Sequence, residues 1–348
     1  MSLTGRLYGV LCLLTTLLGF SLAPSAEAAD GVSATVVSEA STSSELLAQL
    51  QKMQSAARRL NYSGSFVYQQ AAQMRSSRVT HVVVGKSELE KLELLDGKPR
   101  EFVRDNEQVA SYDPDQRIVR RERRVTRDTF PAIIDARPEE LARFYRLASD
   151  GDERVAGRSC RAIVLAPRDK LRYGYRFCAD QATGLLLRAQ TLDGRGEVIE
   201  QIAFTQIDIG AIDRARVNPT YKDTRGWRIE KEAMVPADLS AWQVAPPPGF
   251  RKIQQVRRMI SDSGEPGAAP AQNRPSEREV LQIVFSDGLA AISVFIEPGS
   301  QGREEGTMQQ GAMNILGRRQ GDYWLTVVGE VPAAAISQVA NSIELKSK

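Results

Sequence analysis

The chain has 348 residues, of which 42% are hydrophobic and 26% are charged, and its basic and acidic residues nearly balance to a formal net charge of +3. This composition is ordinary for a globular protein and excludes a chain that is disordered throughout. The length exceeds what one compact core usually holds, so two domains are expected.

Residues 1–29 have the pattern of a secretory signal peptide. Arg6 precedes an apolar run over residues 7–22, and residues 25–28 form a small-x-small cleavage motif. No later run reaches the roughly 20 apolar residues of a membrane span, so we expect a mature protein that is soluble in the periplasm. Cys12 lies inside the apolar run and is not expected to carry a lipid.

The next segment, residues 30–44, is polar and rich in Ser, Thr and Ala, and we expect it to be a disordered lead-in. Thr42 and Glu45 then have the spacing of a capping box, and apolar residues recur at helical spacing as far as Leu60. This amphipathic helix should pack on a sheet.

Short extended segments follow the helix and are separated by turn residues. They are predicted at residues 63–70, 78–85, 91–95, 101–104, 108–112 and 117–124. A second helix is predicted over residues 138–149, with Pro138 near its first position. A long antiparallel sheet with few helices favours a strongly curved sheet or half-barrel.

Residues 152–210 read as an antiparallel meander whose central hairpin suggests a register. If residues 168–170 form a three-residue turn, Cys160 lies directly opposite Cys178. Directly opposed residues have Cβ atoms about 4.5–5.5 Å apart, close to disulfide geometry. We therefore predict a Cys160–Cys178 disulfide in an oxidising compartment; the alternative is two reduced, buried thiols.

The same register places large apolar side chains on one face of the hairpin. They are Ile163, Leu165, Leu171, Tyr173, Tyr175 and Phe177. One interpretation is that helices cover this face as core. The other is that Ile163, Leu165, Tyr173, Tyr175 and Phe177 line a pocket for an acyl chain or an apolar peptide side chain.

After Gly210 the sequence is charged and weakly periodic, which is typical of an interdomain connection. The second domain contains a predicted hairpin around Asp287-Gly288, a strand at residues 322–329 and a terminal helix at residues 331–343. The expected organisation is a signal peptide at 1–29, a lead-in at 30–44, a half-barrel domain at 45–213, a connection at 214–240, and a smaller α+β domain at 241–348 with a mobile loop at 261–278.

Catalytic and metal-binding patterns are missing from the sequence. His81 is the one histidine, no cysteine spacing suits a metal, and no phosphate-binding or dinucleotide-binding glycine motif occurs. We therefore expect neither an enzyme nor a cofactor, and we interpret His81 as a structural residue.

An arginine-rich run is the strongest charge feature. It contains Arg117, Arg120, Arg121, Arg123, Arg124 and Arg127, interrupted by Glu122. Such a run is either a solvated edge or an anion-binding strip, because guanidinium groups match phosphate and carboxylate groups. In the periplasm the anion would be lipopolysaccharide, a phospholipid or an acidic protein segment, and not nucleic acid.

Four segments resemble the MucB/RseB family. They are YSGSFVY at residues 62–68, THVVVG with LELLDGKPREFVR at 80–104, ERVAGRSC with RYGYRFCADQATGLLLRAQTLDG at 153–194, and TVVGEVP at 326–332. The resemblance implies an N-terminal domain similar to the LolA and LolB lipoprotein carriers, an unclosed antiparallel barrel with helices, and a smaller C-terminal α+β domain.

The resemblance also implies a function. Members of this family are periplasmic negative regulators of the sigma-E (AlgU) envelope-stress response. They bind the periplasmic part of an RseA/MucA-type anti-sigma factor and shield it from the site-1 protease, and lipopolysaccharide or lipid releases it. The alternative is a periplasmic lipid or lipoprotein carrier, and a homodimer is possible in either case.

Overall fold

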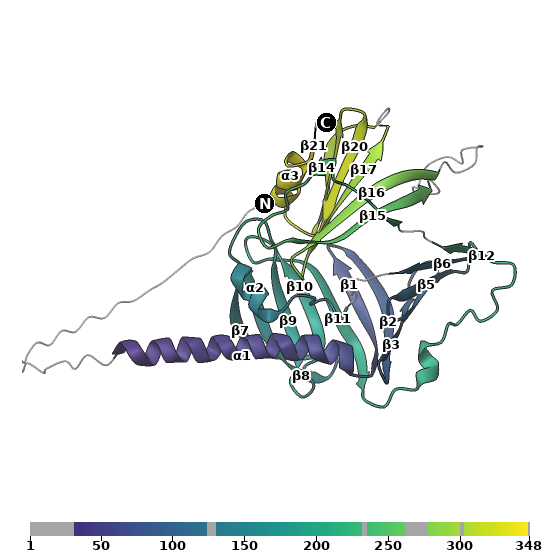
Figure 1. Cartoon of the computed structure of the whole chain (residues 1–348). Helices are drawn as coiled ribbons and strands as arrows, with labels where there is room; N and C mark the ends of the chain where they lie inside the picture. Colours follow the sequence, from purple (N-terminus) through teal and green to yellow (C-terminus); the bar gives the residue numbers. More distant parts are fainter. Residues whose placement is uncertain (1–30, 124–129, 232–234, 262–276, 300–302, 347–348) are drawn as a thin grey trace, which may run out of the picture. The chain divides into compact units, whose positions relative to one another are not determined.

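A curved, twelve-stranded sheet is the larger of the two main sheets of the computed structural model (Figure 1). Its strands follow the order β12-β6-β5-β4-β3-β2-β1-β11-β10-β9-β8-β7, and every pair is antiparallel except β6 with β12. The edge strands β12 and β7 do not pair with each other, so the sheet is unclosed. The predicted unclosed antiparallel sheet is thereby confirmed.

The structure describes residues 31–123, 130–231, 235–261, 277–299 and 303–346. Residues 42–348 form one unit, to which the following description applies. The first sheet comprises β1 (Tyr62–Gln70), β2 (Gln73–Val84), β3 (Ser87–Leu94), β4 (Glu101–Asp105), β5 (Gln108–Asp113), β6 (Ile118–Arg123), β7 (Tyr145–Val155), β8 (Arg158–Pro167), β9 (Gly174–Asp180), β10 (Leu186–Leu192), β11 (Val198–Ile209) and β12 (Arg228–Lys231).

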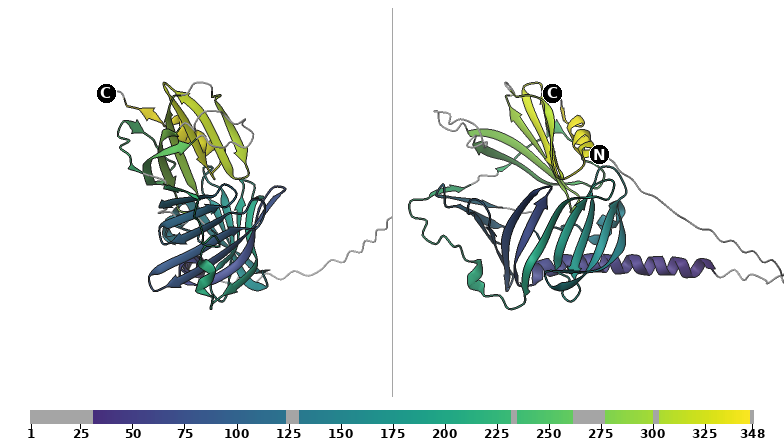
Figure 2. Two further views of the ribbon diagram at one scale, coloured as in Figure 1. Left: turned by 90° about the vertical axis from the view of Figure 1, so that its right-hand side faces the viewer. Right: turned by 180° about the vertical axis from the view of Figure 1, so that it is seen from behind.

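A second, seven-stranded sheet follows in the chain, with the order β13-β15-β16-β17-β20-β19-β18 (Figure 2). Its strands are β13 (Val235–Pro236), β15 (Arg251–Ser261), β16 (Glu277–Ser286), β17 (Ala291–Pro298), β18 (Gly306–Gln310), β19 (Met313–Gln320) and β20 (Tyr323–Gly329). The remaining elements are α1 (Gly31–Arg59), α2 (Pro138–Phe144), a 3-10 helix η1 (Arg214–Val217), α3 (Ala333–Asn341), and the short pair β14 (Trp242–Gln243) with β21 (Glu344–Leu345).

The predicted strands before residue 152, the hairpin at Asp287-Gly288 and the terminal helix are all confirmed. The predicted connection contributes a strand to each sheet, β12 to the first and β13 to the second. The predicted mobile loop lies mostly outside the described residues, and its two ends belong to β15 and β16.

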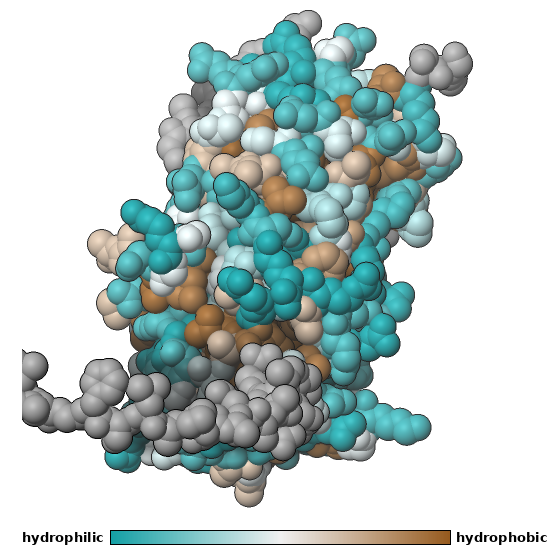
Figure 3. Space-filling model, turned by 90° about the vertical axis from the view of Figure 1, so that its left-hand side faces the viewer, coloured by the Kyte–Doolittle hydropathy of each residue, from teal (hydrophilic) through white to brown (hydrophobic). Residues whose placement is uncertain are grey.

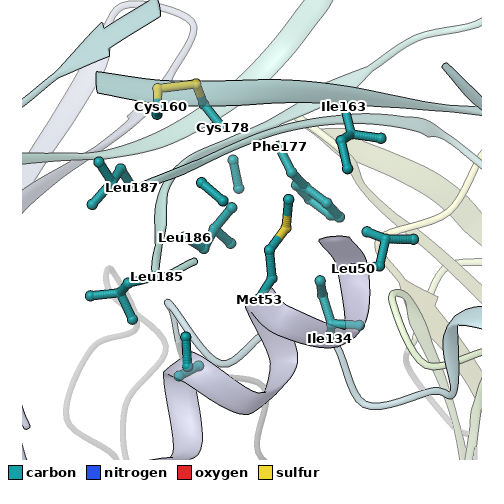
Figure 4. Packing of buried hydrophobic residues seen from close by; sticks show 14 of the residues in the cluster. Leu50, Met53, Ile134, Cys160, Ile163, Phe177, Cys178, Leu185, Leu186 and Leu187 are labelled. Carbon is teal, nitrogen blue, oxygen red and sulfur yellow. A yellow bond between two sulfur atoms is a disulfide. The ribbon is translucent and has the colours of Figure 1, made fainter. Parts of the chain in front are cut away.

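Helix α1 supplies much of the core of the first sheet. Leu50 and Met53 are almost completely buried and point toward Phe177 and Ile163 on the strands (Figure 4). Removing such side chains from water contributes roughly 1.5–3 kcal/mol each. The predicted packing of this helix on a sheet is therefore confirmed.

Two helix boundaries differ from the prediction. Helix α1 begins at Gly31 and passes through Thr42, so Thr42 is not its N-cap and the prediction of a disordered lead-in is wrong for residues 31–44. Helix α2 ends at Phe144, because Tyr145 begins β7 and pairs with β8. Sheet pairing there takes precedence over the helical spacing of the apolar residues.

The predicted register of the β8–β9 hairpin is wrong by two residues. Ala162, and not Cys160, lies opposite Cys178, because a longer connection replaces the three-residue turn. A shift of two preserves the face on which each side chain lies. The cysteines are therefore diagonal neighbours, and the Cys160–Cys178 disulfide is present with a Cα–Cα distance of 5.5 Å.

Charged side chains on the two flanking strands lie opposite the cysteines of the disulfide. Glu153 on β7 lies directly opposite Cys160, and Arg188 on β10 lies directly opposite Cys178. Glu153 forms ion pairs with both Arg188 and Arg176. Both cysteines are almost completely buried, so a reductant in solution should reach the bridge only after the sheet opens locally.

Replacing both cysteines with alanine should destabilise the protein without changing its secondary structure. The bridge closes a loop with a sequence separation of 18, for which the chain-entropy account gives about 3 kcal/mol. Urea unfolding of the variant and of the wild type, with and without a reductant, measures the difference. A variant as stable as the oxidised wild type would contradict a stabilising role for the disulfide.

Candidate functional site

A cleft of about 580 Å³ lies between the two sheets. The first sheet contributes Tyr68, Tyr175 and Ile202 to its lining. A cleft of this volume is typical of sites that bind a small ligand or part of a peptide. Part of the interior of the first sheet is filled by the rings of Phe66, Phe130 and Phe204, which contact one another, and Phe130 also lines the cleft.

The second sheet contributes the other wall of the cleft. Val284, Ser293 and Val328 come from three successive strands, and their opposed positions place them on one face of the sheet. Carboxylate and guanidinium groups stand among the apolar residues that line the cleft; they belong to Glu122, Arg123, Asp135, Glu200, Arg258 and Glu330. A cleft with apolar walls and charges of both signs fits an amphipathic protein segment better than a bare acyl chain.

A buried ion pair joins the two walls near one end of the cleft. Arg172, in the β8–β9 connection, donates from Nε to Oδ2 of Asp287 in the β16–β17 turn at 2.9 Å. The two side chains are 0% and 1% exposed. Arg172 also donates to the carboxylate of Asp169 and to the carbonyl of Pro248.

Every acceptor position of the Asp287 carboxylate is used. Oδ1 accepts from the backbone N–H groups of Leu289 and Ala290, at 3.0 Å each, which closes the turn. Oδ2 also accepts from the hydroxyl of Tyr145 at 3.1 Å. Burial raises the pKa of Tyr145 well above its usual value, and the nearby Tyr175 and Asp287 raise it further, so the phenol stays protonated and donates.

Two aromatic rings enclose the guanidinium group. The Cζ atom of Arg172 lies 4.6 Å from the ring centre of Phe144 and 4.9 Å from that of Phe250. A desolvated cation–π contact contributes about 2 kcal/mol, which partly offsets the cost of burying the charge. We call the group of Arg172, Asp287, Tyr145, Phe144 and Phe250 the clamp.

Gly288 lets the β16–β17 turn approach the segment before α2. Its φ is +94°, and a Cβ atom at this position would lie 2.1 Å from the Cβ of Ala136. Its carbonyl accepts a hydrogen bond from the backbone N–H of Asp135 at 2.8 Å. Only glycine meets both the backbone conformation and the close approach here.

A second set of polar contacts joins the sheets at the β18–β19 turn. The Glu200 carboxylate accepts from Gln70 Nε2 at 2.6 Å and from the backbone N–H of Ala312 at 2.8 Å. Asn314 Nδ2 donates to the hydroxyl of Tyr173 at 3.1 Å. Hydrogen bonds that are largely removed from water therefore join the two sheets on two sides of the cleft.

The predicted apolar set lies in the core for the most part. Ile163, Leu165 and Phe177 are fully buried among α1 side chains, with no open groove above them in the part of the chain that the structure describes. Tyr173 is buried and bonded to Asn314. Tyr175 is the one member of the set that lines the cleft.

The described part of the predicted arginine strip lies on β6 and in the turn before it, beside the edge strand β12, and two of its members are paired. Arg120 contacts Glu230 at 2.7 Å, and Arg123 contacts Glu107. Arg121 is exposed, and Arg117 adopts a φ of +53° in the turn before β6. Arg124 and Arg127 lie outside the described residues. An anion-binding role for the strip stays a prediction.

His81 has the environment of a structural residue. Its ring stacks on Tyr62 with centroids 4.9 Å apart, and Nδ1 lies 2.8 Å from the carbonyl of Leu60. Among the described residues, no group of three or more His, Cys, Asp or Glu side chains is arranged to hold a metal ion. None of the helices in the described ranges is both long and apolar enough to cross a membrane.

Sequence reasoning missed the clamp. Arg172 and Asp287 are far apart in the sequence, and each occurs in a polar turn that looks solvated. Phe144 and Phe250, whose rings enclose the guanidinium group of Arg172, belong to two further segments. The sequence signal near the clamp was Asp287-Gly288. It predicted the turn, but not that this turn packs against the first sheet.

Replacing Gly288 with alanine should separate the sheets at the clamp. Gly299 is a matched control, because its φ is +77° but a Cβ there would meet nothing within 4 Å. Both substitutions should cost roughly 1–2 kcal/mol for the left-handed conformation, and Gly288→Ala should cost more because of the collision with Ala136.

The free energy of unfolding in urea and hydrogen exchange of the residues before α2 would measure this difference. Equal losses of stability in the two variants, with no faster exchange in Gly288→Ala, would show that the close approach at Gly288 is not important.

The matches to known proteins extend over nearly the whole described chain. The family model for the MucB/RseB N-terminal domain matches residues 45–224, and that for the MucB/RseB C-terminal domain matches residues 236–344. The sigma-E factor regulatory protein RseB of Haemophilus influenzae is 25% identical, over 89% of this chain and 95% of that protein. The sigma factor AlgU regulatory protein MucB of Pseudomonas aeruginosa is 29% identical, over 84% and 89% respectively.

The structure is also similar to solved structures with these names. The complex of Pseudomonas aeruginosa MucA and MucB contains a chain that is 27% identical and has a TM-score of 0.66, with 87% of this chain and 100% of that chain covered. MucB in complex with MucA(peri) gives a TM-score of 0.64 at 26% identity, with 86% and 99% covered. Because the two family models together match most of the sequence, this chain belongs to the MucB/RseB family.

Proposed function

We propose that this protein is a periplasmic regulator that binds the periplasmic segment of an RseA/MucA-type anti-sigma factor. The observation that carries the proposal is family membership over both halves of the chain, together with a relative solved in complex with MucA(peri). Binding would protect the segment from the site-1 protease and so keep the sigma factor sequestered. Lipopolysaccharide or lipid would release the segment.

Export to the periplasm is part of the proposal. The apolar run at residues 7–22 and the small-x-small motif at 25–28 support a cleaved signal peptide. The Cys160–Cys178 disulfide supports the same conclusion, because disulfides persist in oxidising compartments.

We place the anti-sigma segment in the cleft between the sheets. Its walls combine apolar side chains with charges of both signs, as is typical of surfaces that bind protein segments. The alternative face, the apolar side of the β8–β9 hairpin, is occupied by α1. The protein would then act by binding the anti-sigma segment and not by catalysis, and the two sheets would form a preorganised receptor for that segment.

The proposal keeps the division of the chain given by the sequence, a half-barrel domain at 45–213 and a smaller domain at 241–348. Each family model covers one of these regions, which supports the division. The clamp and the Glu200 contacts would set the width of the cleft between them.

Replacing Ile253 with glutamate should weaken binding of the anti-sigma segment. Ile253 lines the cleft and is 42% exposed, so the change should not disturb the fold. Ile229, which is 51% exposed on β12, is the matched control. We expect at least a roughly tenfold loss of affinity, about 1.4 kcal/mol, for Ile253→Glu only.

The assay measures cleavage of the segment by its site-1 protease in the presence of wild-type or variant protein. Protection by wild type and Ile229→Glu but not by Ile253→Glu is the expected result. Equal cleavage with and without the wild-type protein would refute the regulator. Equal protection by all three would remove the cleft as the binding site. Adding lipopolysaccharide to the protected sample tests release.

A further inference from the structure

A smaller pocket of about 210 Å³ opens from the cleft beside the turn between β18 and β19. Four residues line both spaces, namely Tyr68, Glu200, Met313 and Glu330. The rest of its lining is polar and comes from the β1–β2 hairpin and from Gln310. We call this space the side pocket. A side chain of a segment that lies in the cleft can therefore enter the side pocket while the segment stays in place.

Glu200 brings a buried negative charge to the side pocket, since it is only 7% exposed. Its carboxylate accepts hydrogen bonds from Gln70 Nε2, from the backbone N–H of Ala312 and from the hydroxyl of Tyr68. All three donors are neutral, and no lysine or arginine in the described ranges of the chain forms an ion pair with Glu200. A buried carboxylate is normally paired with a cation, because burial removes the water that would solvate its charge.

The hydrogen bonds leave one acceptor position of this carboxylate open. An ionised carboxylate has about four such positions, two on each oxygen. Gln70 and Ala312 both donate to Oε1, at 2.6 and 2.8 Å, so the open position is on Oε2. The amide nitrogen of Gln70 also lies 3.2 Å from both the hydroxyl of Tyr68 and the carbonyl of Gln310. The fourth donor must therefore come from a bound molecule.

Gly311 keeps the β18–β19 turn close to the Glu200 carboxylate. Its φ is +57°, and a Cβ atom at this position would lie 2.3 Å from Glu200 Oε1 and 2.1 Å from Gln70 Nε2. Glycine permits both this backbone conformation and this close approach. The backbone N–H of Ala312 thus holds the carboxylate in place, and the side pocket is arranged before any segment binds.

The charges around the side pocket favour a cation. Burial raises the pKa of Tyr68 above its usual value, Glu200 and Glu330 raise it further, and Arg75 opposes them with a smaller effect. Arg75 lies opposite Tyr68 on β2 and is exposed, so water and salt screen its charge. The half-buried ring of Tyr68 also offers a face that attracts a cation.

We propose that the side pocket binds one lysine or arginine side chain of the anti-sigma segment. This inference rests on the proposed function and specifies the charge that the segment carries at one position. An acidic side chain would meet Glu200 and Glu330 as like charges, and an apolar one would leave the Glu200 charge buried without a cation. The apolar stem of a lysine or arginine suits the contact with Met313 at the entrance.

Replacing Glu200 with glutamine tests the charge directly, because glutamine keeps an oxygen that accepts from Gln70 and Ala312. We expect the exported Glu200→Gln protein to bind the anti-sigma segment roughly tenfold more weakly, about 1.4 kcal/mol, in a calorimetric titration. Asp208→Asn is the matched control, because Asp208 is exposed on the same strand, β11, and lines neither the cleft nor the side pocket. This control should bind as tightly as the wild type.

A set of segments, each with one lysine or arginine replaced by glutamine, separates charge recognition from a structural effect of Glu200. One of these replacements should weaken binding to the wild type about tenfold and should cause no further loss with Glu200→Gln. If Glu200→Gln binds as tightly as the wild type, or binds every segment more weakly by the same factor, the proposal is overturned. A wild-type protein that binds no segment would refute the proposed function, and this inference with it.

Discussion

The ion pair between Arg172 and Asp287 is the contact on which the arrangement of the two sheets depends. Breaking a buried pair by removing one partner typically costs 3–5 kcal/mol, because the remaining charge has no water to solvate it. Here the carboxylate also orders its own turn and accepts from Tyr145, while two rings enclose the guanidinium. A slip of either sheet would break these interactions together.

The two sheets form opposite walls of the cleft, and the clamp fixes these walls relative to each other. Along one side the Asp287-Gly288 turn contacts the first sheet, and along the other Glu200 holds the backbone of Ala312. A receptor fixed in this way loses little conformational entropy when a segment enters. The part of the first sheet that α1 covers is filled by packed side chains, among them Leu50, Met53 and Phe177 (Figure 4).

Figure 3 shows one face of the outer surface. Hydrophobic residues form small groups between hydrophilic ones in the upper part of this view and a larger group in its lower half. Large apolar residues that are exposed singly are normal for soluble proteins and need no partner.

The sequence predicted the elements well and the contacts between them less well. Strand positions followed from alternation and turn residues. The disulfide followed from spacing even though the register was wrong by two, since the shift left the side chains within β8 and β9 on their predicted faces. The length of α2 was overestimated because Tyr145 satisfies both a helical pattern and a strand. The clamp and the cleft could not be predicted, since Arg172, Asp287 and Phe250 become neighbours only through packing.

Hydrogen exchange of the full exported protein, with and without the anti-sigma segment, tests the central claim most directly. If the segment occupies the cleft, backbone amides in β16, β17 and β20 and in the segment before α2 should exchange more slowly in its presence. Binding accompanied by slower exchange only on other surfaces, with these amides unchanged, would contradict the assignment of the cleft as the receptor.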